Sequence, residues 1–213
     1  GVNNTLTGSK GNESTNTMLT GFHNTADKVF NTTVIGSENT VTNSKNSLVM
    51  GDNREVKDAN HAVLIGSTDS KTTTSVNNAV AVGHNTNVTV EGGVALGSES
   101  KATVAAGSVG YDPSTKAQST NTDSTWKATK SAVSVGDVNN NITRQITSVA
   151  AGTKDTDAVN VAQLKKLQNQ VNANGSTTVN AGKHINVTTT TNGTTKDYKV
   201  SLSDDITNQI TNN

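Results

Sequence analysis

The sequence predicts a parallel β-solenoid, a stack of short coils, followed by a helix and a small β-hairpin. A short apolar triplet that ends on a glycine recurs at intervals of 15, 15, 15, 17 and 14 residues, often with an asparagine five residues before the glycine. One such unit buries almost no apolar surface by itself, so the units must stack on one another. After residue 150 the apolar spacing becomes helical. The glycines of the repeat are Gly21, Gly36, Gly51, Gly66, Gly83 and Gly97.

Composition alone points to a disordered chain. Only 31% of the residues are hydrophobic and 2% aromatic, which is little for one round core. The formal net charge of zero argues against a solvated tail, and it removes the basic surface expected of a protein that binds nucleic acid or anionic membranes. The chain has no cysteine, hence no disulfide. It has no membrane-length apolar run, and Gly1 does not begin a signal peptide, so we expect an excerpt of a longer protein.

The apolar triplets give each strand two apolar faces. Residues one and three positions before the glycine share one face, and the residue between them faces the opposite way. A strand that is apolar on both faces is buried on both. One face can fill the coil interior, and the other can contact another chain or, alternatively, pack under a loop. We assign the contact with another chain to the middle positions: Leu19, Val34, Val49, Leu64, Ala81 and Ala95.

Other solenoid types fit the repeat poorly. The hexapeptide helices of acyltransferases need steps of six residues, and calcium-binding coils need a G-G-x-G-x-D pattern that is absent. Ice-binding solenoids need a threonine ladder at one fixed offset, whereas the threonines here drift relative to the glycine.

An insertion at 111–130 interrupts the repeat. It carries Pro113, Trp126 and Tyr111 in a polar loop. The two aromatic side chains could form a ligand patch, although aromatic residues in such loops more often anchor the insertion to the solenoid.

The segment 134–171 predicts strands, a glycine turn and then a helix. Residues 155–157 (Asp-Thr-Asp) have the composition of a helix start, and two lysines follow downstream. So short a helix is marginal alone, so we expect a coiled coil over 161–174. Its seam falls at heptad spacing on Val161, Leu164, Gln168 and Val171.

The remaining chain predicts a β-hairpin connector over 175–203. Two alternating threonine-rich runs, 183–191 and 194–202, flank Asn192-Gly193, which is a strong hairpin turn signal. Apolar residues then recur every four positions, which indicates that another stalk helix begins at 204–213.

The segment RQITSVAAGTKDTDAVNVAQL, residues 144–164, closely resembles the neck motif of trimeric autotransporter adhesins, the YadA-like surface proteins of Gram-negative bacteria. The repeats, best represented by NNAVAVG at 77–83, resemble the head repeat of that family, usually written around N-S-V-A-I-G. The 17-residue interval before Gly83 is longer than the usual repeat, and His61 and Gly92 replace the repeat asparagine.

This resemblance implies a homotrimeric, left-handed parallel β-roll head over 1–110, a neck over 131–160 and a coiled-coil stalk. It also implies a location at the bacterial surface, with the membrane-anchoring barrel absent from this chain. The neck residues that match the motif are Arg144, Gln145, Gly152, Asp155 and Asp157.

No catalytic or metal chemistry is expected. The four histidines, at 23, 61, 84 and 184, lie in different turns and lack metal-ligand spacing. Asp155 and Asp157 could bind calcium, but helix capping explains them better, as it does Asp204 and Asp205. We therefore expect no enzyme activity, no metal and no cofactor.

Two functions remain. One is a surface adhesin that binds extracellular matrix, host cells or other bacteria through weak contacts multiplied by the trimer. The other is a structural spacer that displays a more distal binding domain; a phage fibre is a distant third. A solvated face would explain the charges of the candidate ligand surface equally well. That surface consists of Lys28, Lys45, Arg54, Lys57, Lys71, Tyr111 and Trp126.

Overall fold

The computed structural model describes residues 1–174, 177–193 and 195–212, so residues 175–176 and 194 of the expected connector and the final Asn213 lie outside the described residues. The chain divides into two compact units, Gly1–Thr147 and Ser148–Asn213. Each unit is described by itself.

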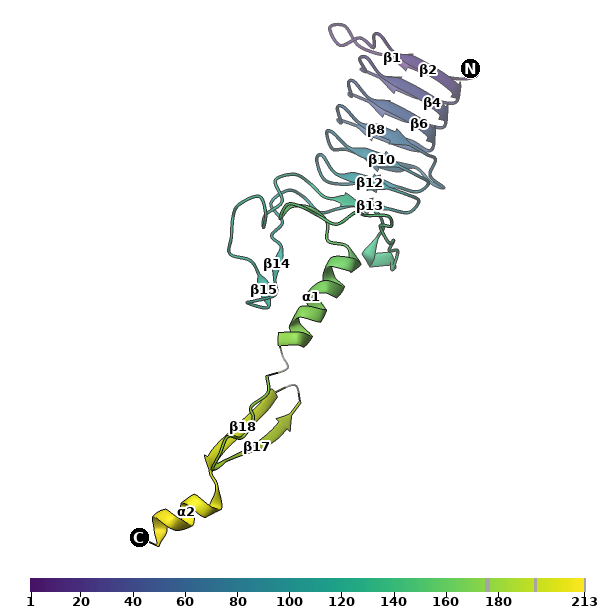
Figure 1. Cartoon of the computed structure of the whole chain (residues 1–213). Coiled ribbons are helices and arrows are strands. Elements are labelled where there is room, and N and C mark those ends of the chain that lie inside the picture. The colour runs from purple at the N-terminus through teal and green to yellow at the C-terminus, as the bar shows by residue number, and fades with distance from the viewer. Residues whose placement is uncertain (175–176, 194, 213) are drawn as a thin grey trace. The chain divides into compact units, whose positions relative to one another are not determined.

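The first unit is a β-roll of stacked coils (Figure 1). Two parallel sheets form it, and each coil contributes one strand to each sheet over most of the stack. The seven-stranded sheet contains β2 (Met18–Phe22), β4 (Thr33–Ser37), β6 (Leu48–Asp52), β8 (Val63–Ile65), β10 (Val80–Val82), β12 (Val94–Leu96) and β16 (Val133–Ser134). The five-stranded sheet contains β1 (Thr5–Thr7), β3 (Thr25–Asp27), β5 (Thr40–Thr42), β7 (Arg54–Lys57) and β9 (Thr72–Thr74). A short parallel pair, β11 (Asn87–Val88) with β13 (Lys101–Ala102), continues the second side.

The repeated glycine is required where the chain leaves the seven-stranded sheet. Gly36 has a φ of 135°, and a Cβ added there would lie 1.8 Å from the carbonyl oxygen of Gly51 in the next coil. Glycine alone permits both the backbone angle and the close approach of the neighbouring backbone. The predicted solenoid is therefore confirmed, and the glycine spacing marks its coils; the left-handed sense stays a prediction.

The interior of the roll is filled by small apolar side chains. Val34, Val49, Leu64, Ala81 and Ala95 have no exposed surface in the single chain, and Leu19 packs half-buried against them. These are the residues that the sequence analysis assigned to a contact with another chain, so that assignment of faces is wrong. Stacked sheets lie only about 10 Å apart, which favours valine and alanine inside and leaves the bulkier side chains to point outward.

The insertion leaves the roll after β13 and contains a two-stranded hairpin, β14 (Tyr111–Asp112) with β15 (Ala117–Gln118). The chain then returns to the seven-stranded sheet, because β16 pairs in parallel with β12 through Val94 and Val133. A short 3-10 helix, η1 (Val138–Asn140), follows.

The second unit contains α1 (Val161–Asn174), the antiparallel hairpin β17 (Ile185–Asn192) with β18 (Thr195–Leu202), and α2 (Asp204–Thr211). Gly193 has a φ of 61°, as the tight hairpin turn requires. Neither helix of the described ranges has the length and apolar character that a bilayer crossing needs.

The start of α1 differs from the expectation. Asn160 Oδ1 accepts a hydrogen bond from the Gln163 backbone N–H at 3.1 Å, and Gln163 Oε1 accepts one from the Asn160 N–H at 3.2 Å. This reciprocal pair is a capping box, which satisfies two N–H groups that a helix start leaves unpaired. Residues 155–157 therefore do not start the helix.

Candidate functional site

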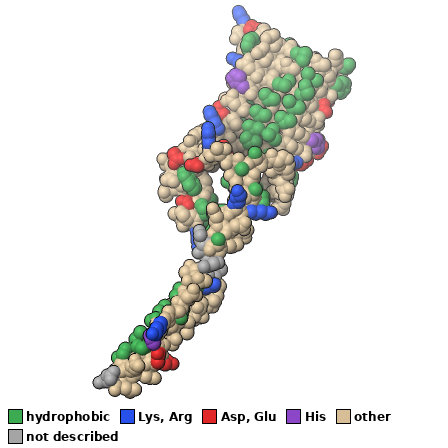
Figure 2. All heavy atoms as spheres, in the orientation of Figure 1, with side chains coloured by type: hydrophobic (Ala, Val, Ile, Leu, Met, Phe, Trp, Pro, Cys, Tyr) green, Lys and Arg blue, Asp and Glu red, His purple; other side chains and the backbone are tan. Residues whose placement is uncertain are grey.

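The outward face of the seven-stranded sheet is apolar. We call its side chains the apolar ladder. Its two columns are in register from coil to coil, so like side chains stack along the roll. Figure 2 shows hydrophobic side chains gathered on one side of the roll. The first column is Ile35, Met50, Ile65, Val82 and Leu96, and the second is Leu48, Val63, Val80, Val94 and Val133.

The apolar ladder is only partly covered by its own chain. Met50, Val82 and Leu96 are 39%, 37% and 39% exposed, and Val133 is 61% exposed. Strands are spaced about 4.8 Å apart, so a column of five side chains extends for about 19 Å. An apolar face of this length is uncommon on a water-exposed protein surface and is typical of an interaction site.

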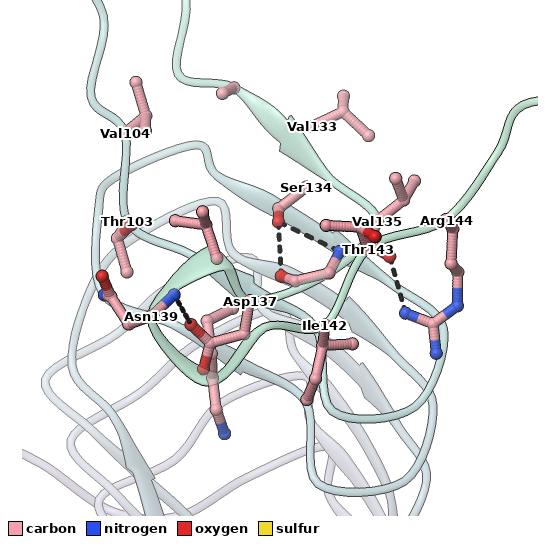
Figure 3. Close-up of a pocket in the computed structure, with 14 residues that line it drawn as sticks. Thr103, Val104, Val133, Ser134, Val135, Asp137, Asn139, Ile142, Thr143 and Arg144 are labelled. Carbon is pink, nitrogen blue, oxygen red and sulfur yellow. Dashed lines mark hydrogen bonds between the residues drawn. The ribbon is translucent and has the colours of Figure 1, made fainter.

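Arg144 lies beside Val135 at the end of the roll (Figure 3). Its guanidinium donates to the Val135 carbonyl at 2.6 Å and to the Ser98 carbonyl at 2.7 Å. It also covers Gly97, where an added Cβ would lie 3.2 Å from the guanidinium carbon. Arg144 therefore binds the backbone that a further coil would otherwise pair with, which explains an arginine at the first residue of the neck motif.

A pocket of about 360 Å³ lies at this end of the roll. Apolar side chains from β16 and the following loop line it, among them Val133, Val135 and Ile142 (Figure 3). Asp137 is nearly buried at its wall, where its carboxylate accepts from the Asn139 N–H and the Asn140 side-chain amide. The carboxylate thus stabilises the loop, and the pocket has no paired acid and base for catalysis.

The remaining predicted neck residues lie in the second unit, except Gln145, which is exposed at the end of the first. Gly152 accepts a hydrogen bond from Gln163 Nε2 at 3.0 Å, which ties the neck loop to α1. Asp157 accepts from the backbone N–H groups of Thr153 and Lys154 at 2.9 and 3.0 Å, and these bonds lower the pKa of its carboxyl. Asp155 is exposed.

The expected seam of α1 is unpartnered in the single chain. Val161, Leu164 and Val171 are 67%, 60% and 61% exposed, and Gln168 lies exposed between them. Leu167, which the heptad reasoning missed, is 55% exposed beside this seam. So much exposed apolar surface on one short helix indicates that it packs against other helices.

Comparisons with known proteins agree with this geometry. Residues 145–187 match the family model described as the coiled stalk of trimeric autotransporter adhesin. The chain is similar to autotransporter adhesin BadA of Bartonella henselae, with 52% identity over 82 residues, and to trimeric autotransporter adhesin AtaA of Acinetobacter sp. strain Tol 5, with 51% over 86 residues; each match covers 38% of this chain. Adhesin YadA of Yersinia enterocolitica is 71% identical over 35 residues, or 16% of the chain. These matches cover 3%, 2% and 8% of the respective relatives.

The chain is therefore similar to trimeric autotransporter adhesins, and residues 145–187 match the coiled stalk of that family. This confirms the resemblance to trimeric autotransporter adhesins. Trimeric autotransporter adhesins are surface-exposed outer-membrane proteins of Gram-negative bacteria, and they are adhesins rather than enzymes.

The candidate ligand residues lie on different coils and on the insertion. Lys45 and Lys57 are exposed, Lys28 lies 3.8 Å from Asp27, and Lys71 donates to Thr40 Oγ1 at 3.0 Å. Tyr111 is 62% exposed and Trp126 half-buried in the insertion.

Arg54 does not belong to that surface. Its side chain has no exposed area and lies inside the roll, so assigning it to an outward face is wrong. Its position three residues after Gly51 was the missed signal, because the same position holds the buried residues Asn24 and Asn39 in the preceding coils.

The histidines make polar contacts at exposed turns. His23 Nδ1 lies 2.9 Å from Glu38, His84 Nε2 lies 3.0 Å from Asp69, and His184 Nδ1 lies 3.0 Å from Asp205. Hydrogen bonds lower the pKa of Asp69, mainly the one from the Asn85 side chain. Within the described ranges, no group of three His, Asp or Glu side chains could hold a metal ion.

Proposed function

We propose that this segment functions as a homotrimer whose three rolls meet through the apolar ladder and whose three α1 helices meet through the Val161 seam. The observation that carries the proposal is the in-register apolar ladder, which the single chain leaves partly exposed. Membership of a trimeric family implies the homotrimer itself. Burial of apolar surface contributes about 25 cal/mol per Å² to the free energy of association. Covering the two columns of the apolar ladder in a trimer would therefore stabilise the association of the rolls.

Light scattering on the 213-residue chain tests the assembly. The chain has a mass of 21.9 kDa, so the expected result is a species of about three times that mass. A single species at the mass of one chain would contradict the proposal.

We further propose that the trimer is part of an adhesive passenger that attaches the bacterium to extracellular matrix, host cells or other bacterial cells. The named relatives are adhesins, which supports this reading. With the apolar ladder facing the trimer centre, the polar five-stranded sheet, the turns and the insertion remain free for ligands. Each coil and each chain repeats similar polar groups, so weak single contacts multiply through multivalency.

The second candidate is a structural spacer that holds a more distal binding domain away from the membrane. The positions of the candidate lysines favour the spacer, because they lie on different coils and do not converge on one site. These lysines are Lys28, Lys45, Lys57 and Lys71.

Binding of the purified chain to an array of matrix proteins, to host cells and to bacterial cells separates the two candidates. Adhesion predicts saturable binding that weakens when the trimer is dissociated. Absence of binding by a verified trimer would favour the spacer.

A further inference from the structure

Buried asparagines form a hydrogen-bonded ladder along one inner corner of the roll. Asn24 and Asn39, each three residues after a repeat glycine, are fully buried. Asn24 Nδ2 donates to the carbonyl of Gly36, and Asn39 Nδ2 to that of Gly51, both at 2.6 Å. Asn39 also donates from its backbone and side chain to Asn24 Oδ1, at 3.1 and 2.9 Å. Each asparagine therefore links its own coil to the next one.

Arg54 occupies the following position of this ladder but reaches twice as far. Its backbone N–H donates to Asn39 Oδ1 at 2.9 Å, and its Nε donates to the Gly66 carbonyl at 2.7 Å, as an asparagine would. The rest of the guanidinium extends to the coil beyond, donating to the carbonyls of Gly83 at 3.1 Å and Thr86 at 2.6 Å and to Thr86 Oγ1 at 2.9 Å. One side chain thus links three consecutive coils.

The coil that runs from Gly66 to Gly83 explains why the Arg54 side chain extends past the neighbouring coil. Its interval of 17 residues includes a corner at 69–71 whose three residues are all exposed. Pairing with the previous coil resumes at Thr72, which is the register partner of Arg54. Thr72 would be the next ladder residue, but its hydroxyl donates to the Ser70 carbonyl at 3.1 Å. The bulge at 69–71 therefore leaves the carbonyl of Gly83 without the asparagine that serves its counterparts.

We propose that Arg54 is an internal clamp that allows the roll to carry the surface bulge 69–71 without losing the register of its coils. A buried cation is costly unless hydrogen bonds saturate it, and four bonds to oxygen atoms of the next two corners do so here. Thr86 Oγ1 also donates to Gly83, so the clamp joins an existing cluster. The bulge and the arginine are thus a matched pair. The bulge removes the asparagine position that would donate to the Gly83 carbonyl, and Arg54 donates to that carbonyl from the preceding coil.

A cycle of three variants tests the match. The first is Arg54→Asn. The second deletes residues 69–71 and carries Thr72→Asn, which gives this coil a regular interval and its own ladder asparagine. The third combines both sets of changes, so that asparagines continue the ladder past both positions. The control is Lys57→Asn, which removes an exposed cation from the same strand, β7.

Amide hydrogen exchange of β8 and β10 in the full chain is the readout. Arg54→Asn keeps the bond to Gly66 but leaves the buried Thr86 carbonyl unpaired, so exchange should rise about 100-fold or more. The deletion variant should show a similar rise, because its new asparagine competes with the guanidinium for one space. In the combined variant, the exchange rates of β8 and β10 should return to within about tenfold of those in the original protein. Lys57→Asn should leave these rates unchanged.

Simple addition of the two effects in the combined variant would overturn the proposal, since a matched pair requires strong coupling. The test holds even if Arg54→Asn does not fold. In that case the combined variant must recover a folded roll, and a combined variant no better than Arg54→Asn refutes the clamp.

Discussion

Leu64 and Ile65 are neighbours on β8 and should respond to substitution in opposite ways. Leu64 lies in the roll interior with no exposed surface, between Val49 and Ala81 of the adjacent strands. Ile65 faces outward in the apolar ladder. We expect Leu64→Ala to weaken the fold but keep the trimer, and Ile65→Asp to dissociate the trimer but keep the fold.

The magnitudes follow from burial. Truncating a buried leucine to alanine costs about 2–5 kcal/mol, which lowers the melting temperature by roughly 5–20 °C in a domain of this size. For Ile65→Asp, the single chain already covers most of each Ile65 side chain, so the trimer loses only about 0.5–1 kcal/mol of apolar burial per isoleucine, and burying three carboxylates adds several kcal/mol to that loss. A loss of about 5–9 kcal/mol shifts the dissociation constant by roughly four to six powers of ten. In the separated chain, an outward aspartate changes strand stability by only about 1 kcal/mol.

Light scattering combined with thermal circular dichroism measures both properties on one sample. Leu64→Ala should keep about three times 21.9 kDa and melt earlier, while Ile65→Asp should fall to one chain mass and keep its strand signal. Thr42→Asp, on the outward face of β5, is the control for adding a charge elsewhere on the roll. An Ile65→Asp protein that stays trimeric with unchanged melting would refute the assignment of the apolar ladder to the trimer.

Three further outcomes are expected. Gly36→Ala should destabilise the roll by about 3 kcal/mol or more in denaturant unfolding, because the new Cβ would meet the backbone of the next coil at 1.8 Å. Gln163→Ala should lower α1 stability by about 1 kcal/mol in circular dichroism melts, whereas Gln170→Ala on the same helix should not. Two backbone N–H groups lower the pKa of the Asp157 carboxyl, so its charged form stabilises the turn at pH values above the unfolded-state pKa of about 3.9. That stabilisation is lost as the pH falls through the pKa of the folded state. NMR titration of Asp157 should therefore give a midpoint below 3.9.

Periodicity predicted the coils but not which strand face is inside. The glycine spacing indicated the stacking, since each triplet repeats one unit, and the structure pairs Gly36 with Gly51 in register. Alternation is symmetric between the two faces of a strand, so it cannot tell interior from exterior. Side-chain size could have done so, because the middle positions at 81 and 95 are alanines whereas the flanking positions carry Ile65 and Met50.

The helix start could also have been read from local chemistry. Acidic residues at 155–157 have the composition of a first helical turn, yet Asp157 instead accepts bonds from its own preceding turn. The pattern Asn160-x-x-Gln163 directly before the heptad residues is the stronger signal, since it satisfies two backbone donors reciprocally. What no local pattern could supply is the second bond of Gln163, to Gly152, because it depends on how the neck loop folds back.

The low hydrophobic content pointed to disorder only because a single round core was assumed. In a stack, each coil is covered by its neighbours on both sides, so small apolar groups such as Val41 and Ala26 suffice to fill the interior. The rest of the inner volume holds polar groups such as Asn39, Thr86 and Arg54, and among the described residues no buried side-chain nitrogen or oxygen lacks a hydrogen-bond partner. A buried polar group is costly only when it is unpaired, so a ladder that pairs every rung lets a polar sequence form an ordered roll. The same reasoning makes Arg54 a buried residue: the register of the coil, rather than the charge of the side chain, decides where it lies.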